Sequence, residues 1–171
     1  MKKLIAFILL AAAPAAFAAA PYAGATAGYL IDGEQGFFAA RIGSEVAAAN
    51  GLIHSIEGEI GFGSTIDYGL RLNFVPVMVN YRLRADSGNP GLSYYAGGGA
   101  GASRQKLTGL VEDDAWAFAL QAFGGIEYTV TPAVSMTLGA RYLWINKYTI
   151  ANVGVDSGDD VALEIGFRVR M

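Results

Sequence analysis

Apolar and polar side chains alternate along most of the chain that follows residue 20. The final segment is the clearest case: from Val161 to Met171 every odd position is apolar and every even position is small or charged. Alternation with a period of two residues is the pattern of a β-strand whose two faces meet different surroundings. No segment shows a competing helical period. The pattern therefore predicts an all-β protein.

Turn-forming residues divide this alternating sequence into eight segments. They span residues 22–31, 36–48, 53–63, 67–84, 92–106, 114–129, 133–147 and 160–170. Each reaches the length of about 9–11 residues that a transmembrane β-strand needs. The turn signals between them are Asp32-Gly33, Asn50-Gly51, the cluster at 86–91, and Thr131-Pro132. Short connections between consecutive strands predict an antiparallel up-and-down meander.

The fourth segment changes phase midway. Apolar residues occupy even positions up to Phe74 and odd positions from Val75. An extra residue in a strand moves side chains from one face to the other, and the neighbouring Pro76 cannot donate a ladder hydrogen bond. We therefore predict a β-bulge near Phe74 and Val75.

The fifth segment carries three glycines on one face, Gly97, Gly99 and Gly101. In a narrow barrel of eight strands, missing side chains leave room for long side chains that reach in from opposite strands. We predict that these glycines line such a crowded interior.

The first residues form an export signal. Lys2 and Lys3 precede an unbroken apolar stretch, and Ala16-Phe17-Ala18 is a cleavage site of the A-x-A type. We predict a signal peptide over residues 1–18 and a barrel domain over residues 19–171. Cleavage after Ala20 is disfavoured because it would leave Pro21 directly after the cut. A membrane anchor is the alternative, but this alanine-rich stretch is shorter than the ~20 apolar residues of a spanning helix.

Composition narrows the class of protein further. The chain is 53% hydrophobic, yet past residue 20 no apolar run approaches the length of a spanning helix. An exported chain of this kind is typical of a transmembrane β-barrel, in which only alternate residues need to face lipid. There is no cysteine, so no disulfide stabilises the fold. A net charge of −3 without a basic tract speaks against a nucleic-acid partner.

Two local stretches, residues 76–82 and 94–101, add a family resemblance. Together with the signal peptide and the eight segments, these stretches make the chain resemble the small OmpA-like outer-membrane β-barrels of the porin family. The resemblance implies an eight-stranded antiparallel barrel in a bacterial outer membrane, with both chain ends on the periplasmic side. It also implies lipid, lipopolysaccharide and the outer-membrane assembly machinery as partners. Members commonly end in an outward aromatic residue, whereas this chain ends in Met171, with Phe167 four residues before it.

The polar faces of the segments collect charges of both signs. We predict a charge cluster in the lumen that consists of Arg41, Glu45, Glu57, Glu59, Arg71, Glu127, Arg141, Glu164 and Arg168, with Gln121 beside it. The interior of an eight-stranded barrel is just wide enough for side chains. Buried charges must be paired, because each unpaired one costs several kcal/mol. The cluster is therefore interpreted as ion pairs that plug the lumen, and a narrow water or ion path is the alternative.

Aromatic residues gather toward the ends of the segments. We predict two girdles at the membrane interfaces, an arrangement typical of transmembrane barrels. The external girdle comprises Tyr68, Trp116, Tyr142 and Trp144, with Phe62 and Phe118, and the periplasmic girdle comprises Tyr22, Tyr81, Tyr94, Tyr128 and Phe167. Ordinary β-propensity in a soluble sheet is the alternative explanation.

No constellation of residues indicates catalysis. His54 is the only histidine, and alternation places the neighbouring Ser55 and Glu57 on the opposite face. The sequence holds no cluster of metal-ligating His or Cys and no phosphate-binding glycine loop. We predict no catalytic residue, no cofactor and no resident metal. The acidic loop stretches 112–114 and 156–160 are interpreted as solvated tips, and weak binding of divalent cations is the alternative.

The sequence predicts a non-catalytic outer-membrane barrel with a structural or surface-interaction role and a plugged lumen. Three alternatives remain open: a small pore, a surface adhesin, and a soluble exported barrel that carries a ligand. The last would bury the apolar faces and expose the charged ones.

Overall fold

Strands make up almost all of the structure. The computed structural model describes residues 20–67, 70–108, 113–150, 153–155 and 159–171, so the expected signal peptide and Tyr68 lie outside the described residues. The strands are β1 (Ala20–Leu30), β2 (Gln35–Ala49), β3 (Leu52–Asp67), β4 (Leu70–Asp86), β5 (Leu92–Thr108), β6 (Asp113–Thr129), β7 (Val134–Ile145), β8 (Tyr148–Ile150), β9 (Val153–Val155) and β10 (Asp159–Arg170). Among these residues no helix is long and apolar enough to cross a membrane.

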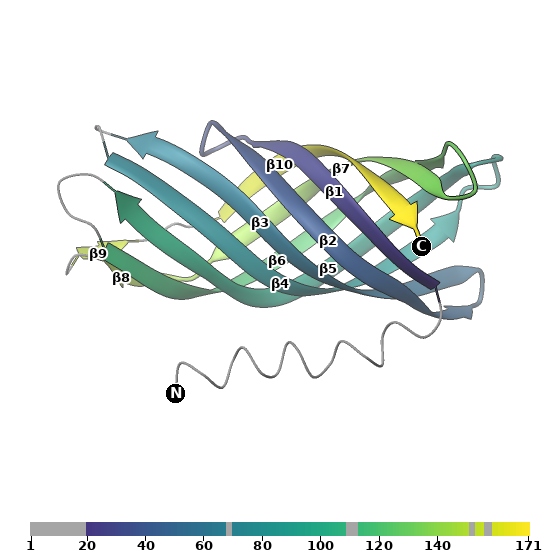
Figure 1. Cartoon of the computed structure of the whole chain (residues 1–171), viewed down its shortest axis with the longest axis horizontal. Coiled ribbons are helices and arrows are strands. Elements are labelled where there is room, and N and C mark those ends of the chain that lie inside the picture. The colour runs from purple at the N-terminus through teal and green to yellow at the C-terminus, as the bar shows by residue number, and fades with distance from the viewer. Residues whose placement is uncertain (1–19, 68–69, 109–112, 151–152, 156–158) are drawn as a thin grey trace.

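Strands β1 to β7 and β10 form one closed barrel in which each strand pairs antiparallel with its neighbours in the chain (Figure 1). The pairing of β1 with β10, which sets Tyr22 opposite Arg170, closes the ring. Closure satisfies the backbone groups that an open edge would leave unpaired. The predicted eight-stranded antiparallel meander is confirmed. The small hairpin β8–β9 was not expected, because its residues fall in the connection interpreted as a loop.

Turn chemistry explains the tight connections at the end of the barrel where the described chain both begins, at Ala20 in β1, and ends, at Met171 after β10. Asn50 and Gly51 both have positive φ, 52° and 77°, as a two-residue hairpin turn between twisted strands requires. Gly88 and Gly91 adopt positive φ in the connection between β4 and β5. A side chain at any of these glycines would strain the backbone.

The predicted bulge near Phe74 and Val75 is wrong. β4 keeps a single register with both β3 and β5, and no shift occurs beside Pro76. Phe74 and Met78 instead point into the barrel, where both are buried. The prediction assumed that every apolar face is turned outward, whereas the interior is itself apolar near this end. The bulge of the structure lies in β2, between Glu45 and Ala47.

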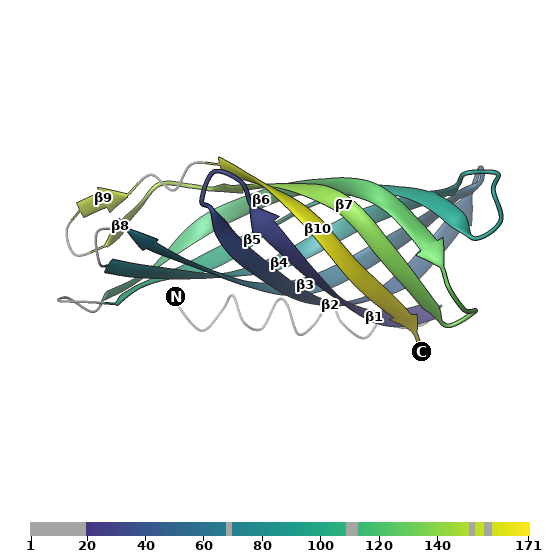
Figure 2. The same ribbon diagram turned by 90° about the horizontal axis from the view of Figure 1, so that it is seen from above.

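Four strands project beyond the rest of the barrel at the end opposite the chain ends. β3 continues through residues 64–67 past its last partner on β2, which is Phe37 opposite Gly63. β6 begins with residues 113–118, before its first partner on β7. The sheet formed by β3, β4, β5 and β6 therefore extends past the rim set by the other strands (Figure 2).

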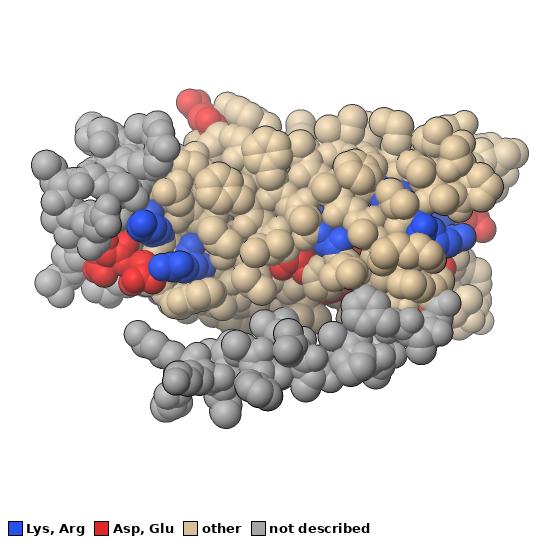
Figure 3. Space-filling model, viewed as in Figure 1, with Lys and Arg blue, Asp and Glu red and all other residues tan. Residues whose placement is uncertain are grey.

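The outer wall is apolar and the interior is polar over most of the barrel. In β7, Leu138 is 57% exposed, whereas Arg141, Ser135 and Thr137 face the inside and are buried. Much of the wall visible in Figure 3 carries no charged residue. A soluble barrel would show the reverse distribution, since its charged face would be turned to water.

The glycines of β5 line a crowded interior, but the side chains that use the space differ from those predicted. A Cβ atom at Gly97 would collide with Phe123, one at Gly99 with Asn80, and one at Gly101 with Met78. These side chains come from the neighbouring strands β4 and β6 rather than from across the barrel. The missing side chains of β5 thus make space for larger ones next to them.

Replacing Leu138 with arginine is expected to destabilise the barrel by about 2–4 kcal/mol, the cost of a cation at the lipid midplane. Replacing Ser135 with alanine, on the interior face of the same strand, is expected to change stability little. Unfolding by urea in lipid vesicles, followed by tryptophan fluorescence, measures both. Equal losses for the two variants would contradict the assignment of the faces.

Candidate functional site: the filled lumen

Inward-facing side chains line the lumen in three successive zones. Their order follows from strand position, because zone members lie at corresponding points along neighbouring strands. We name them the apolar layer, at the end with the projecting strands, the Arg141 layer in the middle, and the Arg82 layer at the end with both chain ends.

The Arg141 layer is a compact network around one guanidinium. Arg141 donates from Nε to Glu164 Oε1 at 2.5 Å, and from Nη2 to Glu59 Oε2 at 3.1 Å. Its Nη1 also donates to Glu59 and to Gln121. Arg41 Nη2 lies 3.5 Å from Glu59 Oε2 and 3.9 Å from Glu164 Oε2. Two arginines thus face two glutamates, and the layer is neutral.

Gln121 links this layer to β4. Its side-chain nitrogen donates to Asn80 Oδ1 at 2.6 Å and to Glu59 Oε1 at 3.1 Å. The guanidinium of Arg141 also lies over the ring of Phe37, 5.1 Å from its centroid. The buried cation therefore has partners on several sides, as a charge removed from water requires.

The Arg82 layer holds more arginines. Glu127 accepts from Arg82 and from Arg168, both at 2.5 Å. Arg82 Nη1 lies 3.6 Å from Glu57 Oε1. Its guanidinium stacks over Tyr95, 4.1 Å from the ring centroid. This layer ties β3, β4, β6 and β10 together across the lumen.

Glu45 forms ion pairs with three arginines at the mouth of the lumen. It accepts from Arg84 at 3.1 Å, from Arg168 at 3.3 Å and from Arg170 at 3.4 Å. The β2 bulge that follows Glu45 lies where the strand reaches this mouth. With Arg82, four arginines of this layer pair with three glutamates, Glu45, Glu57 and Glu127.

Several of these residues were missed by sequence reasoning. Arg82 and Arg84 occupy even positions of β4, opposite the apolar odd positions that follow Val75. That alternation could have placed them in the lumen. The side chain of Arg71, predicted for the cluster, lies outside the described residues. The structure places the other eight predicted members inside the barrel, with Glu45 at the rim.

The prediction of Tyr22 in the periplasmic girdle is wrong. Its side chain is 1% exposed and points into the lumen, where its hydroxyl donates to Glu57 Oε1 at 2.7 Å. The guanidinium of Arg168 lies 4.7 Å from its ring centroid. β1 alternates alanine with glycine and threonine, so its sequence carried little information about which face is inside.

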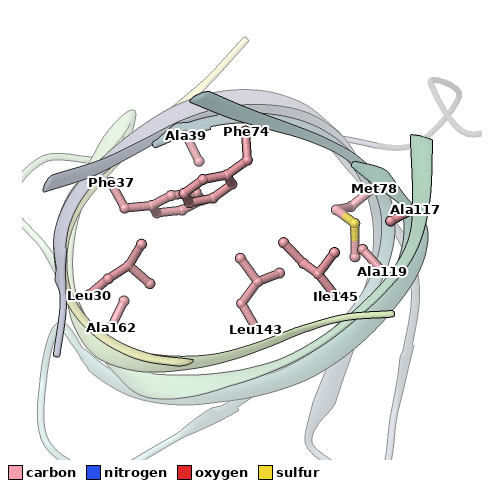
Figure 4. Packing of buried hydrophobic residues seen from close by; sticks show 10 residues of the cluster. All are labelled: Leu30, Phe37, Ala39, Phe74, Met78, Ala117, Ala119, Leu143, Ile145 and Ala162. Carbon is pink, nitrogen blue, oxygen red and sulfur yellow. The ribbon is translucent and has the colours of Figure 1, made fainter. Parts of the chain in front are cut away.

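The apolar layer was not foreseen. Phe37 and Phe74 stack with their ring centroids 6.1 Å apart, and other apolar side chains point inward from the remaining walls of the lumen (Figure 4). The other members are Leu30, Ala39, Met78, Ala117, Ala119, Leu143, Ile145 and Ala162. The layer adds an apolar zone to the two charged ones.

The other described girdle residues lie on the outer wall. Trp116 and Tyr142 are exposed toward the projecting end, and Trp144 packs edge-to-face against the exposed Phe118. The remaining girdle members toward the opposite end, all exposed, are Tyr81, Tyr94, Tyr128 and Phe167. Phe62 is exposed as well, as are Tyr29 and Phe38, which the sequence analysis did not include.

His54 has no Ser-His-acid arrangement around it. Its Nδ1 is hydrogen-bonded to the hydroxyl of Tyr81 at the surface, whereas Ser55 and Glu57 are buried inside the barrel. Within the part of the chain that the structure describes, no group of three His, Cys, Asp or Glu side chains is placed to hold a metal ion.

The acidic loops are only partly described, because residues 112 and 156–158 lie outside the described ranges. Asp160 has a structural contact: its carboxylate accepts from the backbone N–H groups of Asp32 at 3.0 Å and Gly33 at 2.8 Å. Asp114 accepts from Arg104 Nε at 3.1 Å. The contacts of Asp160 fix the turn after β1, whereas the Arg104–Asp114 pair is exposed at the surface of β5 and β6.

Comparisons with known proteins agree with this architecture. Residues 4–170 match the family model described as the outer membrane protein beta-barrel domain. No curated protein matches the chain significantly by sequence.

Among solved structures, the chain is similar to Neisserial surface protein A (NspA), with a TM-score of 0.63, 19% identity, and coverage of 89% of this chain and 96% of that one. For Ail, the attachment invasion locus protein of Yersinia pestis, the TM-score is 0.53 and the identity 14%, and the match covers 89% of this chain and 97% of that one. For the outer membrane enzyme PagL, the TM-score is 0.52 and the identity 8%, with coverage of 88% of this chain and 99% of that one. At these identities the likeness concerns the fold alone.

Replacing Arg141 with glutamine is expected to cost about 3–5 kcal/mol, because it leaves buried glutamates without their main counter-charge. The matched control is Arg104→Gln, which breaks a surface ion pair whose side chains are 51% and 48% exposed. Such pairs contribute about 0–1 kcal/mol. Urea unfolding in vesicles compares the two, and similar losses would show that the Arg141 layer does not hold the barrel together.

Proposed function

Because the chain belongs to the family of the outer membrane protein β-barrel domain, we propose that it is a non-catalytic barrel with a structural or surface-interaction role and a sealed lumen. Membership of this family implies that the protein resides in a bacterial outer membrane. The observation that carries the proposal is the succession of two ion-paired layers and one apolar layer across the interior.

The chemistry of these layers supports a seal. Arg141, Arg82 and Glu127 are almost fully buried and bonded to partners on other strands. An ion that passed would have to break such pairs without water to replace them, which is costly in a medium of low dielectric constant. It would then meet the stacked rings of Phe37 and Phe74, which offer no hydrogen bond.

The projecting sheet supports a role at the surface. β3 has 16 residues and β4, β5 and β6 have 17 each, whereas crossing a membrane takes about 9–11. The excess falls largely at the end opposite the chain ends, which would be the external end. Ail, whose name refers to attachment, has the same kind of fold. A surface contact is therefore favoured over a transport role.

We propose a non-catalytic role. The fold alone does not require one, because PagL has a similar fold and is an enzyme. It is supported by the contact of His54 with Tyr81 and by the burial of Ser55 on the other face. The proposal includes removal of residues 1–18 as a signal peptide, insertion by the outer-membrane assembly machinery, and lipopolysaccharide as the lipid neighbour. Weak binding of divalent cations at the acidic loop tips remains part of it.

In planar bilayers the purified protein is expected to show no single-channel steps. The triple variant Phe37→Ala, Phe74→Ala, Arg141→Ala removes parts of two layers and is expected to conduct, provided that gel mobility without heating shows it folded. Clear steps from the unaltered protein would overturn the sealed lumen and favour the pore.

Membrane placement and orientation are tested with single cysteines, since the chain has none of its own. A membrane-impermeant maleimide is expected to label Asp32→Cys on intact cells and Asn89→Cys only after the cells are broken. The reverse pattern would contradict the orientation. Release by carbonate without detergent would contradict insertion into the membrane.

A further inference from the structure

Two basic side chains interrupt the apolar outer wall. Arg104 and Lys106 are exposed at alternate positions of β5, near the end of the barrel with the projecting strands. The arginines described inside the barrel are paired with the lumenal glutamates. Arg104 and Lys106 are thus the described basic residues on the outward face of the barrel strands.

Their neighbours across the β5–β6 pairing combine charge with an aromatic surface. Arg104 lies opposite Trp116, and Lys106 lies opposite Asp114. Trp116 is 60% exposed, and Phe118, two residues further along the same face, is 50% exposed. At the end of the molecule that carries β8 and β9, Figure 3 shows Lys or Arg atoms close to Asp or Glu atoms.

The ion pair between Arg104 and Asp114 is weak enough for another anion to replace the carboxylate. Arg104 donates to Asp114 at 3.1 Å, but about half of each side chain is exposed. A pair in that setting is weak, because water screens it and two flexible side chains must be held together. An anion with several charged oxygens would compete successfully with one exposed carboxylate.

The depth of these residues points to the kind of anion. Exposed tryptophan marks the level of the lipid headgroups. Outward cations are costly at the midplane of a bilayer but tolerated at its interface. A basic pair beside Trp116 therefore stands where lipid phosphates lie, with the apolar wall directly below for acyl chains.

We propose that Arg104, Lys106 and Trp116 form a binding site for the phosphorylated sugar headgroup of the lipid in the external leaflet, lipid A. The site deepens the proposed function, because its external location rests on the proposed orientation. The two cations contact phosphate, the indole ring lies against the lipid, and Asp114 is the competing anion that the phosphate displaces.

The test uses Trp116 as the reporter. The chain has two tryptophans, so Trp144→Phe leaves Trp116 alone. Diphosphorylated lipid A, or the same lipid without phosphates, is titrated into detergent micelles that hold the full barrel. The phosphorylated lipid is expected to saturate the change in fluorescence at a lower concentration. Arg104→Gln and Lys106→Gln are each expected to weaken binding about fivefold, the scale of one basic residue at an anionic lipid surface.

Two further variants separate a binding site from a general effect of charge. Asp114→Asn is expected to strengthen binding of diphosphorylated lipid A, since it removes the competing carboxylate. Arg170→Gln removes one exposed arginine at the opposite end, and lipid A binding is expected to stay unchanged. Folding of every variant is checked by its gel mobility without heating.

Three results would overturn the proposal: equal binding of the dephosphorylated lipid, an equal loss in Arg170→Gln, or no gain in Asp114→Asn. Sucrose octasulfate serves as the soluble polyanion, and binding as tight as that of lipid A would mean a free polyanion instead of a lipid. A conducting lumen with intact lipid A binding would overturn only the sealed barrel. Loss of the lipid site in a non-conducting barrel with the expected labelling pattern would overturn only this inference.

Discussion

The pairing of buried charges across a narrow lumen is the constraint on which the rest of the structure depends. Closing eight strands pairs the strand edges around the ring but leaves an interior that only side chains can fill. Arg141 shows the consequence, since one guanidinium serves Glu59, Glu164 and Gln121 from three other strands. Such a network favours these inward faces, because a slip of one residue in a strand would turn its charged side chains to the outer wall.

The interior is not uniform along its axis, and this bears on function. The mouth beside the chain ends has three arginines around Glu45, the middle is neutral, and the far end is apolar. A pore favours a continuous polar path, whereas here an apolar layer follows two ion-paired ones. The two ends of the outer wall also differ, because tyrosines lie near one end and Trp116 lies beside basic residues near the other. The fold hosts enzymes as well as other proteins, so the function has to be argued from these particular surfaces.

Much of the architecture was readable from the chain because the membrane imposes a strict alternation. Strands that separate lipid from a polar lumen must change character at every residue, which made β7 and β10 clear and located their ends within about three residues of the structure. Asn50-Gly51 could be recognised because few dipeptides adopt two successive positive φ angles. Eight members of the charge cluster were named from the same alternation, which brought them to the interior without saying which pairs they form.

Alternation by itself determined that this protein has eight strands with two unlike faces, since it records that each strand meets two different media. It left open whether the apolar faces meet lipid or the core of a soluble barrel. Only the tertiary structure decided which medium each face meets where the rule breaks down. Phe37 and Phe74 are inside because the rim of the lumen is apolar, and a local pattern cannot distinguish that rim from lipid. Tyr22 is inside because closure brings it beside Glu57 and Arg168, partners distant in sequence. Partner choice within the lumen depends on distances between strands, and these exist only once the barrel has closed.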